Sequence, residues 1–167
     1  YSKGRMSLAD TVFNGNIAHS KGDYQGGGAL YNANTGTFAL GGVVFNGNLA
    51  FKGGGGALYN AFNATGVISQ TAFNGNISGD LSTAGHGGGL YNEGDLVVTQ
   101  ATFNANIAAG DGRGGGLLNN RNGTLQLTNS NFVANLTPDG KGGALANTNE
   151  PNPVPSDATI EALNITI

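Results

Sequence analysis

One short motif, Phe-x-x-Asn, occurs five times along the chain, and successive copies begin 32, 28, 30 and 29 residues apart. The copies begin at Phe13, Phe45, Phe73, Phe103 and Phe132. A second motif, Gly-Gly-(Ala/Gly)-Leu-x-Asn, keeps the same period and begins at residues 27, 55, 87, 114 and 142. A fixed period in this range means that one structural unit is copied and stacked on itself. The repeat therefore constrains the architecture more than any other feature of the chain.

Each unit also contains a segment in which apolar and variable residues alternate. In the second unit, Gly36 is followed by Phe38 and Leu40, and in the fourth unit Gly94 is followed by Leu96 and Val98. Alternation with a period of two is typical of a strand with one buried face. We therefore predict three short strands per unit: the Gly-Gly-x-Leu-x segment, the alternating segment and the segment around Phe-x-x-Asn.

Three short strands bury little apolar surface alone, but stacked copies of them can share a core. The sequence predicts an all-β fold, a parallel β-solenoid without helices, of about five turns of roughly 29 residues each. Neighbouring turns are expected to rise about 4.8 Å, which makes a rod roughly 24 Å long.

The repeated Phe and Asn positions are expected to form columns inside this rod. A buried amide without a partner costs roughly 2–7 kcal/mol, so each Asn is predicted to bond to the equivalent Asn one turn away. One predicted ladder comprises Asn16, Asn48, Asn76, Asn106 and Asn135. A second comprises Asn32, Asn60, Asn92, Asn119 and Asn147. The five motif Phe side chains are predicted to stack as an aromatic column in the core.

The pairing of Gly-Gly-Ala-Leu with Phe-x-x-Asn resembles the repeats of polymorphic outer-membrane proteins and related right-handed β-helix surface proteins. The likeness covers roughly residues 4–147, and Gly89 and Gly116 stand where that family has Ala. In that family the repeats form the exported passenger of autotransporters and act in adhesion. The resemblance therefore implies a β-helix at the cell surface or outside the cell.

Three segments differ in composition: a solenoid over 1–147, a Pro-rich linker over 148–157 and a terminal strand over 158–167. The chain begins at Tyr1, in the middle of a repeat unit, which suggests a trimmed product or one piece of a longer chain. Two alternatives are open for the terminal strand. It either folds back as a partial sixth turn or adds to a neighbouring subunit through open solenoid ends. The residues predicted for such assembly are Tyr1, Ile160, Ile165 and Ile167.

Charged residues make up 10% of the chain, which has a net charge of −3 and no Cys. The absence of a basic stripe argues against nucleic acid as a partner, and no run of about 18 apolar residues predicts a membrane span. Six titratable residues are predicted to line one edge of the rod: Asp80, Asp111, Asp139, His86, Arg113 and Lys141. They predict either a ligand edge for cations or polysaccharides, or a solvated turn with compensating charges.

The sequence thus favours a structural protein, either a filament subunit or a segment of an adhesin stalk. The predicted partner is the chain itself, in a head-to-tail homopolymer, or glycans of a host or cell surface. The alternative is a β-helix that binds or cleaves carbohydrate at the charged edge. No catalytic arrangement, metal site or cofactor is predicted.

Overall fold

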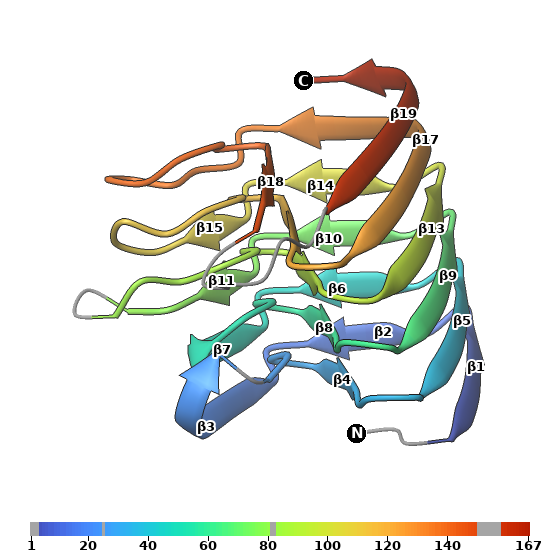
Figure 1. Cartoon of the computed structure of the whole chain (residues 1–167), viewed down its shortest axis with the longest axis horizontal. Coiled ribbons are helices and arrows are strands. Elements are labelled where there is room, and N and C mark those ends of the chain that lie inside the picture. Colours follow the sequence, from blue (N-terminus) through green and yellow to red (C-terminus); the bar gives the residue numbers. More distant parts are fainter. Residues whose placement is uncertain (1–3, 25, 81–82, 150–157) are drawn as a thin grey trace.

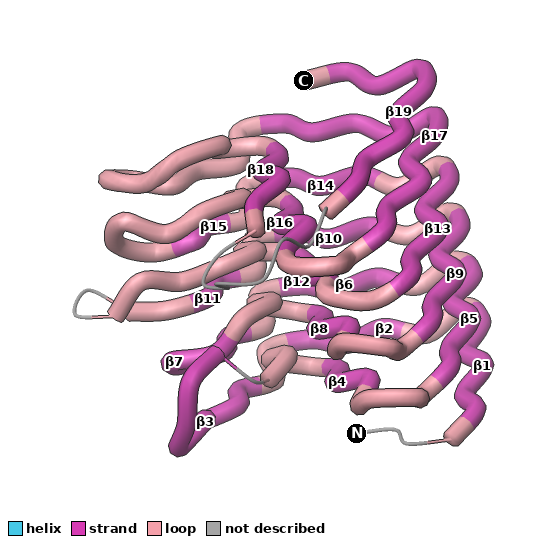
Figure 2. The backbone as a smooth tube through the Cα atoms, in the orientation of Figure 1, coloured by secondary structure: helices cyan, strands magenta, loops and turns pink. Residues whose placement is uncertain are grey.

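The computed structural model describes residues 4–24, 26–80, 83–149 and 158–167, and these contain strands and turns but no helix (Figures 1 and 2). The chain winds through successive turns that stack along one axis, and each turn crosses three sheets, here named A, B and C. All pairs of neighbouring strands in the sheets are parallel. The predicted all-β parallel β-solenoid is therefore confirmed.

Sheet A contains the Leu-x-Asn strands. Its strands are β4 (Leu30–Asn32), β8 (Leu58–Asn60), β12 (Leu90–Asn92), β16 (Leu117–Asn120) and β18 (Leu145–Thr148). Equivalent residues lie in register, so that Leu58 pairs with Leu90 and Asn60 pairs with Asn92. Because neighbouring side chains point to opposite faces, the Leu enters the core and the next residue points outward.

Sheet B has two segments joined by a corner. The first segment contains β1 (Arg5–Ala9), β5 (Thr37–Gly41), β9 (Thr65–Ser69), β13 (Asp95–Thr99) and the first parts of β17 (Thr124–Val133) and β19 (Thr159–Thr166), which both continue past the corner. The second contains β2 (Val12–Asn14), β6 (Val44–Asn46), β10 (Ala72–Asn74), β14 (Thr102–Asn104) and the second half of β17. One residue per turn has a positive φ at the corner: Asp10, Gly42, Gln70, Gln100, Asn129 and Asn164. The sequence analysis did not identify this corner.

Sheet C is the shortest and leads into loops that project from the rod (Figure 1). Its strands are β3 (Ile17–Tyr24), β7 (Leu49–Gly53), β11 (Ile77–Ser78) and β15 (Ile107–Ala108). The loops return to sheet A through the Gly-Gly pair. A Cβ at Gly56 would collide with the carbonyl oxygen of Gly88 one turn away, so the repeated glycine allows adjacent turns to approach closely.

The motif Phe side chains form one column through the core. Successive rings are nearly parallel, and their centroids are 5.0, 4.9, 4.7 and 4.6 Å apart from Phe13 to Phe132. Phe45, Phe73 and Phe103 are fully buried, whereas Phe13 in the first turn is only partly buried. Leu and Val side chains of sheets A and B complete the core around this column.

The Asn side chains form two hydrogen-bonded ladders along the axis. In the first, each Nδ2 donates to the Oδ1 of the next Asn at 2.8–2.9 Å, from Asn16 to Asn135. In the second, the corresponding distances are 2.7–3.0 Å, from Asn32 to Asn147. Side chains of the first ladder also bond to the backbone of a neighbouring turn. For example, Asn76 Nδ2 donates to the Phe45 carbonyl at 3.1 Å.

The terminal strand β19 lies on the solenoid of its own chain. It pairs in parallel with β17, with Ile160 opposite Leu125 and Ile165 opposite Ser130. Ile160 and Ile165 pack against the core, whereas Ile167 is 79% exposed. Tyr1 and residues 150–157 lie outside the described residues.

Candidate functional site

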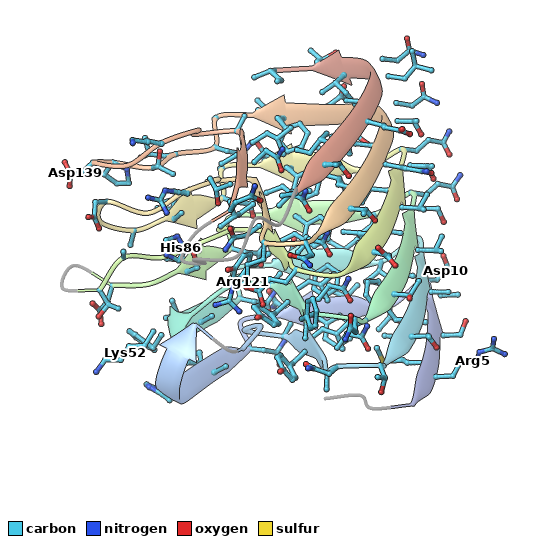
Figure 3. The ribbon with its side chains drawn as sticks, in the orientation of Figure 1. Arg5, Asp10, Lys52, His86, Arg121 and Asp139 are labelled. Carbon is cyan, nitrogen blue, oxygen red and sulfur yellow. The ribbon has the colours of Figure 1, made fainter. Side chains whose placement is uncertain are left out.

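The predicted charged edge lies on the projecting loops. Parallel bridges align His86 with Arg113 and Arg113 with Lys141, so the three basic residues form a column one turn apart. The same register places Asp139 opposite Asp111, and the Asp139 amide donates to the Gly110 carbonyl at 3.2 Å. Figure 3 shows Asp139 at the outer end of its loop and His86 nearer to the stacked strands.

Asp80 lies outside the acidic alignment. It pairs with Thr83 across its own loop in an antiparallel bridge, and the atoms of the neighbouring loop that lie nearest to a Cβ at Gly110 belong to Ala84 and Thr83. Among the described residues of the three loops, the acidic alignment therefore joins Asp111 and Asp139. Within the described part of the chain, no group of three or more His, Cys, Asp or Glu side chains could hold a metal ion.

A buried polar cluster, which sequence reasoning missed, lies on the outer face of sheet A. The Glu93 carboxylate is 3% exposed and accepts hydrogen bonds from the hydroxyls of Tyr59 and Tyr91, the latter at 2.9 Å. Arg121 Nε lies 3.1 Å from Glu93 Oε1, and the Arg121 side chain is 41% exposed. Asn120 Nδ2 donates to the Tyr91 hydroxyl at 2.7 Å. We call these five residues the Tyr–Glu–Arg cluster.

Packing and a projecting loop cover this cluster. Tyr59 and Tyr91 meet edge to face with centroids 5.0 Å apart, and the loop that follows sheet C passes so close that a Cβ at Gly54 would collide with the Tyr91 ring. Burial, together with the nearby Glu93 charge, raises the pKa of Tyr59 far above its ordinary value. The pKa of Tyr91 is raised for the same two reasons. Both tyrosines therefore stay neutral and act as donors to the carboxylate.

One sequence signal could have indicated this cluster. The position after the second-ladder Asn is Ala33, Ala61, Glu93, Asn120 and Thr148 in successive turns. A single carboxylate appears there between two small apolar residues and two polar residues. Thr148 also donates to Asn120 Oδ1 at 2.8 Å, so the polar half of this column is bonded from turn to turn. The charge is well partnered and shows no ligand position.

A shallow hollow lies on the outer face of the first segment of sheet B. It has a volume of about 390 Å³ and crosses β9, β13, β17 and β19. Its walls carry Thr hydroxyls together with the carboxylates of Asp95 and Glu161, and no basic residue lines it. The Thr124 hydroxyl donates to Asp95 Oδ1 at 2.6 Å. The hollow is separate from the charged edge, for which the sequence analysis left open a ligand edge or a solvated turn.

The comparisons with known proteins agree with this geometry. Residues 10–33 and 42–61 match the family model of the Chlamydia polymorphic membrane protein repeat. These stretches contain β2, β3 and β4 in one turn and β6, β7 and β8 in the next. No curated protein and no solved structure matches the chain. The protein is a parallel β-solenoid with repeats similar to those of the polymorphic membrane proteins, as the sequence resemblance predicted.

Proposed function

We propose that the protein is a stiff rod at the cell surface or outside the cell, acting as a segment of an adhesin stalk or as a filament subunit. The observation that carries this proposal is the unbroken pair of Asn ladders, which joins every turn from Asn16 to Asn135 and from Asn32 to Asn147. A rod needs this kind of continuity, because any turn without axial bonds would be a hinge.

The surface location is supported by the family match, since the matched repeat is described as part of a Chlamydia membrane protein. The part of the chain that the structure describes holds no helix long and apolar enough to cross a membrane.

We further propose that rods extend end to end. The first turn presents edge strands such as β1 and β4, and the last presents β18, each at an end of its sheet order, together with β19, which pairs with β17. Open strand edges bind further strands readily. A second copy, or a further solenoid turn, placed there would continue the Phe column and both Asn ladders. Binding of surface glycans stays a prediction.

Electron microscopy of the purified chain tests the proposal. We expect rods of constant width whose lengths are multiples of one subunit. Removal of residues 158–167 should shorten these rods, because it removes β19 from the growing end. Compact particles without rods would contradict end-to-end assembly, and rods of unchanged length after the deletion would show that β19 is not the connector.

A further inference from the structure

The outer face of the first segment of sheet B carries three rows of side chains, and each strand contributes one residue to each row. The first row is Arg5, Thr37, Thr65, Asp95, Thr124 and Thr159. The second row is Ser7, Ala39, Val67, Val97, Gln126 and Glu161. The third row is Ala9, Gly41, Ser69, Thr99, Thr128 and Leu163. We call this surface the three-row face.

Charge is distributed unevenly along the three-row face. Arg5 is its single cation, lies on β1 at one end, and projects away from the rest of the molecule (Figure 3). The carboxylates are Asp95 on β13 and Glu161 on β19, toward the opposite end. A surface with opposite charges at its two ends complements a copy of itself in reversed order.

The middle of the three-row face is small and partly apolar. Val67 on β9 is 46% exposed, and Val97 on β13 lies beside it in register. The flanking positions on β5 are Ala39 and Gly41. At the far end Leu163 is 64% exposed. Among the described residues, no other strand lies outside these strands in Figure 1, so the exposed atoms of Val67 and Leu163 face solvent, whereas Val97 is partly buried.

We propose that the three-row face binds the same face of a second copy, side by side, with the order of strands reversed. A two-fold axis along the strands, midway between β9 and β13, then sets β1 opposite β19 of the second copy. Arg5 comes opposite Thr159 and within reach of Glu161 of the second copy. Val67 comes opposite Val97 of the second copy, so apolar residues meet at the centre.

The reversed order is favoured over the alternative, in which both copies run in the same order. In that arrangement β19 faces β19, and Glu161 lies opposite Glu161 of the second copy. Two carboxylates would then be brought together without a cation, which is unfavourable in a partly desolvated interface. The strands of a second copy also have the same spacing, so each strand of one copy can lie opposite a strand of the other.

The size of the face predicts a weak association. Six strands about 4.8 Å apart, each about five residues of 3.3 Å, give roughly 400 Å² per copy. Stable protein interfaces bury about 800 Å² per partner. We therefore expect a dimer that forms and dissociates with concentration. It differs from the end-to-end contact of the proposed function, because a two-fold pair is closed and does not grow.

Sedimentation velocity over a concentration series tests this proposal. The parent chain is expected to show a monomer–dimer equilibrium. The double variant Val67→Lys with Val97→Lys should lower the association constant at least tenfold, because it sets like charges opposite each other at the centre. The variant Val67→Glu with Val97→Lys should associate more strongly than the double-lysine variant, because opposite charges then meet across the axis.

The matched control places the same charges on the neighbouring segment of sheet B. Ala72→Lys with Thr102→Lys changes outward positions on β10 and β14, at the same two turns, and should leave the dimer unchanged. Thermal melts of each variant establish that the solenoid is intact. The variant Arg5→Glu should weaken the dimer, and Arg5→Glu with Glu161→Arg should restore it.

Three results would overturn the lateral pairing. The parent chain could remain monomeric at every concentration, which is also the outcome if a peptide or glycan occupies the face. The control pair could weaken the dimer as much as the Val67 and Val97 pair. Finally, an open series of oligomers could appear that is insensitive to the Val67 and Val97 variants, which would support end-to-end growth alone. Conversely, a closed dimer without longer species would support lateral pairing and contradict the end-to-end proposal.

Discussion

The interior columns and the Tyr–Glu–Arg cluster are both buried and hydrogen-bonded, yet they are built in opposite ways. In the columns, the same bond recurs at each turn, as between Asn48 and Asn76 and between Asn76 and Asn106. In the cluster, one carboxylate, Glu93, accepts bonds from the hydroxyl of Tyr91 in its own turn and of Tyr59 one turn away, and pairs with Arg121 from the turn on the other side. The columns repeat along the whole rod, whereas the cluster joins only three neighbouring turns.

Because of this difference, a buried hydrogen-bonded group can stabilise the fold without being recognisable in the sequence. A residue repeated in five turns appears in the sequence as a pattern, and its neighbours above and below are known in advance. A single buried charge appears once, and only its departure from the other residues at that repeat position marks it in the sequence. We therefore expect the interior columns to tolerate change least in central turns, and the Tyr–Glu–Arg cluster to stabilise mainly the turns from β8 to β16.

The largest effect is expected for Asn76→Asp. The Asn76 side chain donates to Asn106 Oδ1 and to the Phe45 carbonyl, and it is fully buried. A carboxylate oxygen would face the Asn106 Oδ1 acceptor without a proton between them, and it would bring a charge into the core. We therefore expect the free energy of unfolding to fall by about 5 kcal/mol or more. Urea denaturation measures this loss. The exposed, outward Asn104→Asp is the control, expected within about 0.5 kcal/mol of the parent; equal melts for both variants would contradict the ladder.

Phe73→Ala should cost about 3–5 kcal/mol, because it opens a cavity between the rings of Phe45 and Phe103. Phe13→Ala should cost clearly less, since Phe13 is only partly buried in the first turn. Comparison of the two free energies of unfolding measures how much more a Phe side chain stabilises the fold in a central turn than in the first turn. If both variants lost the same stability, the aromatic column would not be the continuous core described above.

Removal of the carboxylate by Glu93→Ala should cost about 3 kcal/mol, because it leaves the hydroxyls of Tyr59 and Tyr91 without their acceptor. Arg121→Ala should cost less, about 1 kcal/mol, since the Arg121 side chain is 41% exposed. A double-mutant cycle measures the coupling between the two residues. Additive losses would show that the ion pair contributes nothing beyond packing.

The smallest effect, absent at neutral pH, is expected in alkali. The pKa of Tyr59 and the pKa of Tyr91 are raised in the folded protein, from an ordinary value of 10.0. Their contribution is therefore fully present below pH 10 and is lost as the pH rises above it. The variant Tyr91→Phe should flatten the fall in melting temperature above pH 10. A fall of the same steepness in both proteins would assign the alkaline loss to other groups.

The fold and its columns could be predicted because they depend on repeated residues. The spacing of Phe45 and Phe73 and of Asn48 and Asn76 already implies that equivalent residues stack, and the structure places them in register. The fold-back of β19 could not be decided in advance. Its alternating residues suit any open edge, whether that edge belongs to the same chain or to another.

The corner of sheet B and the position of Asp80 are features that the sequence repeat could not predict. The corner needs a positive φ in each turn, but it is occupied by residues as different as Asp10, Gly42 and Gln70, so no motif marks it. Asp80 has the right distance from Asn76 in sequence, yet its loop folds on itself through Thr83 and removes it from the acidic alignment. The three-row face was equally hidden, because outward positions vary from turn to turn.

The most direct test of vertical stacking is a nuclear Overhauser experiment on a chain in which only the phenylalanine rings carry protons. The account predicts inter-ring cross-peaks between Phe13 and Phe45, Phe45 and Phe73, Phe73 and Phe103, and Phe103 and Phe132, in one continuous series. Rings of Phe45 and Phe73 without a mutual cross-peak would contradict it.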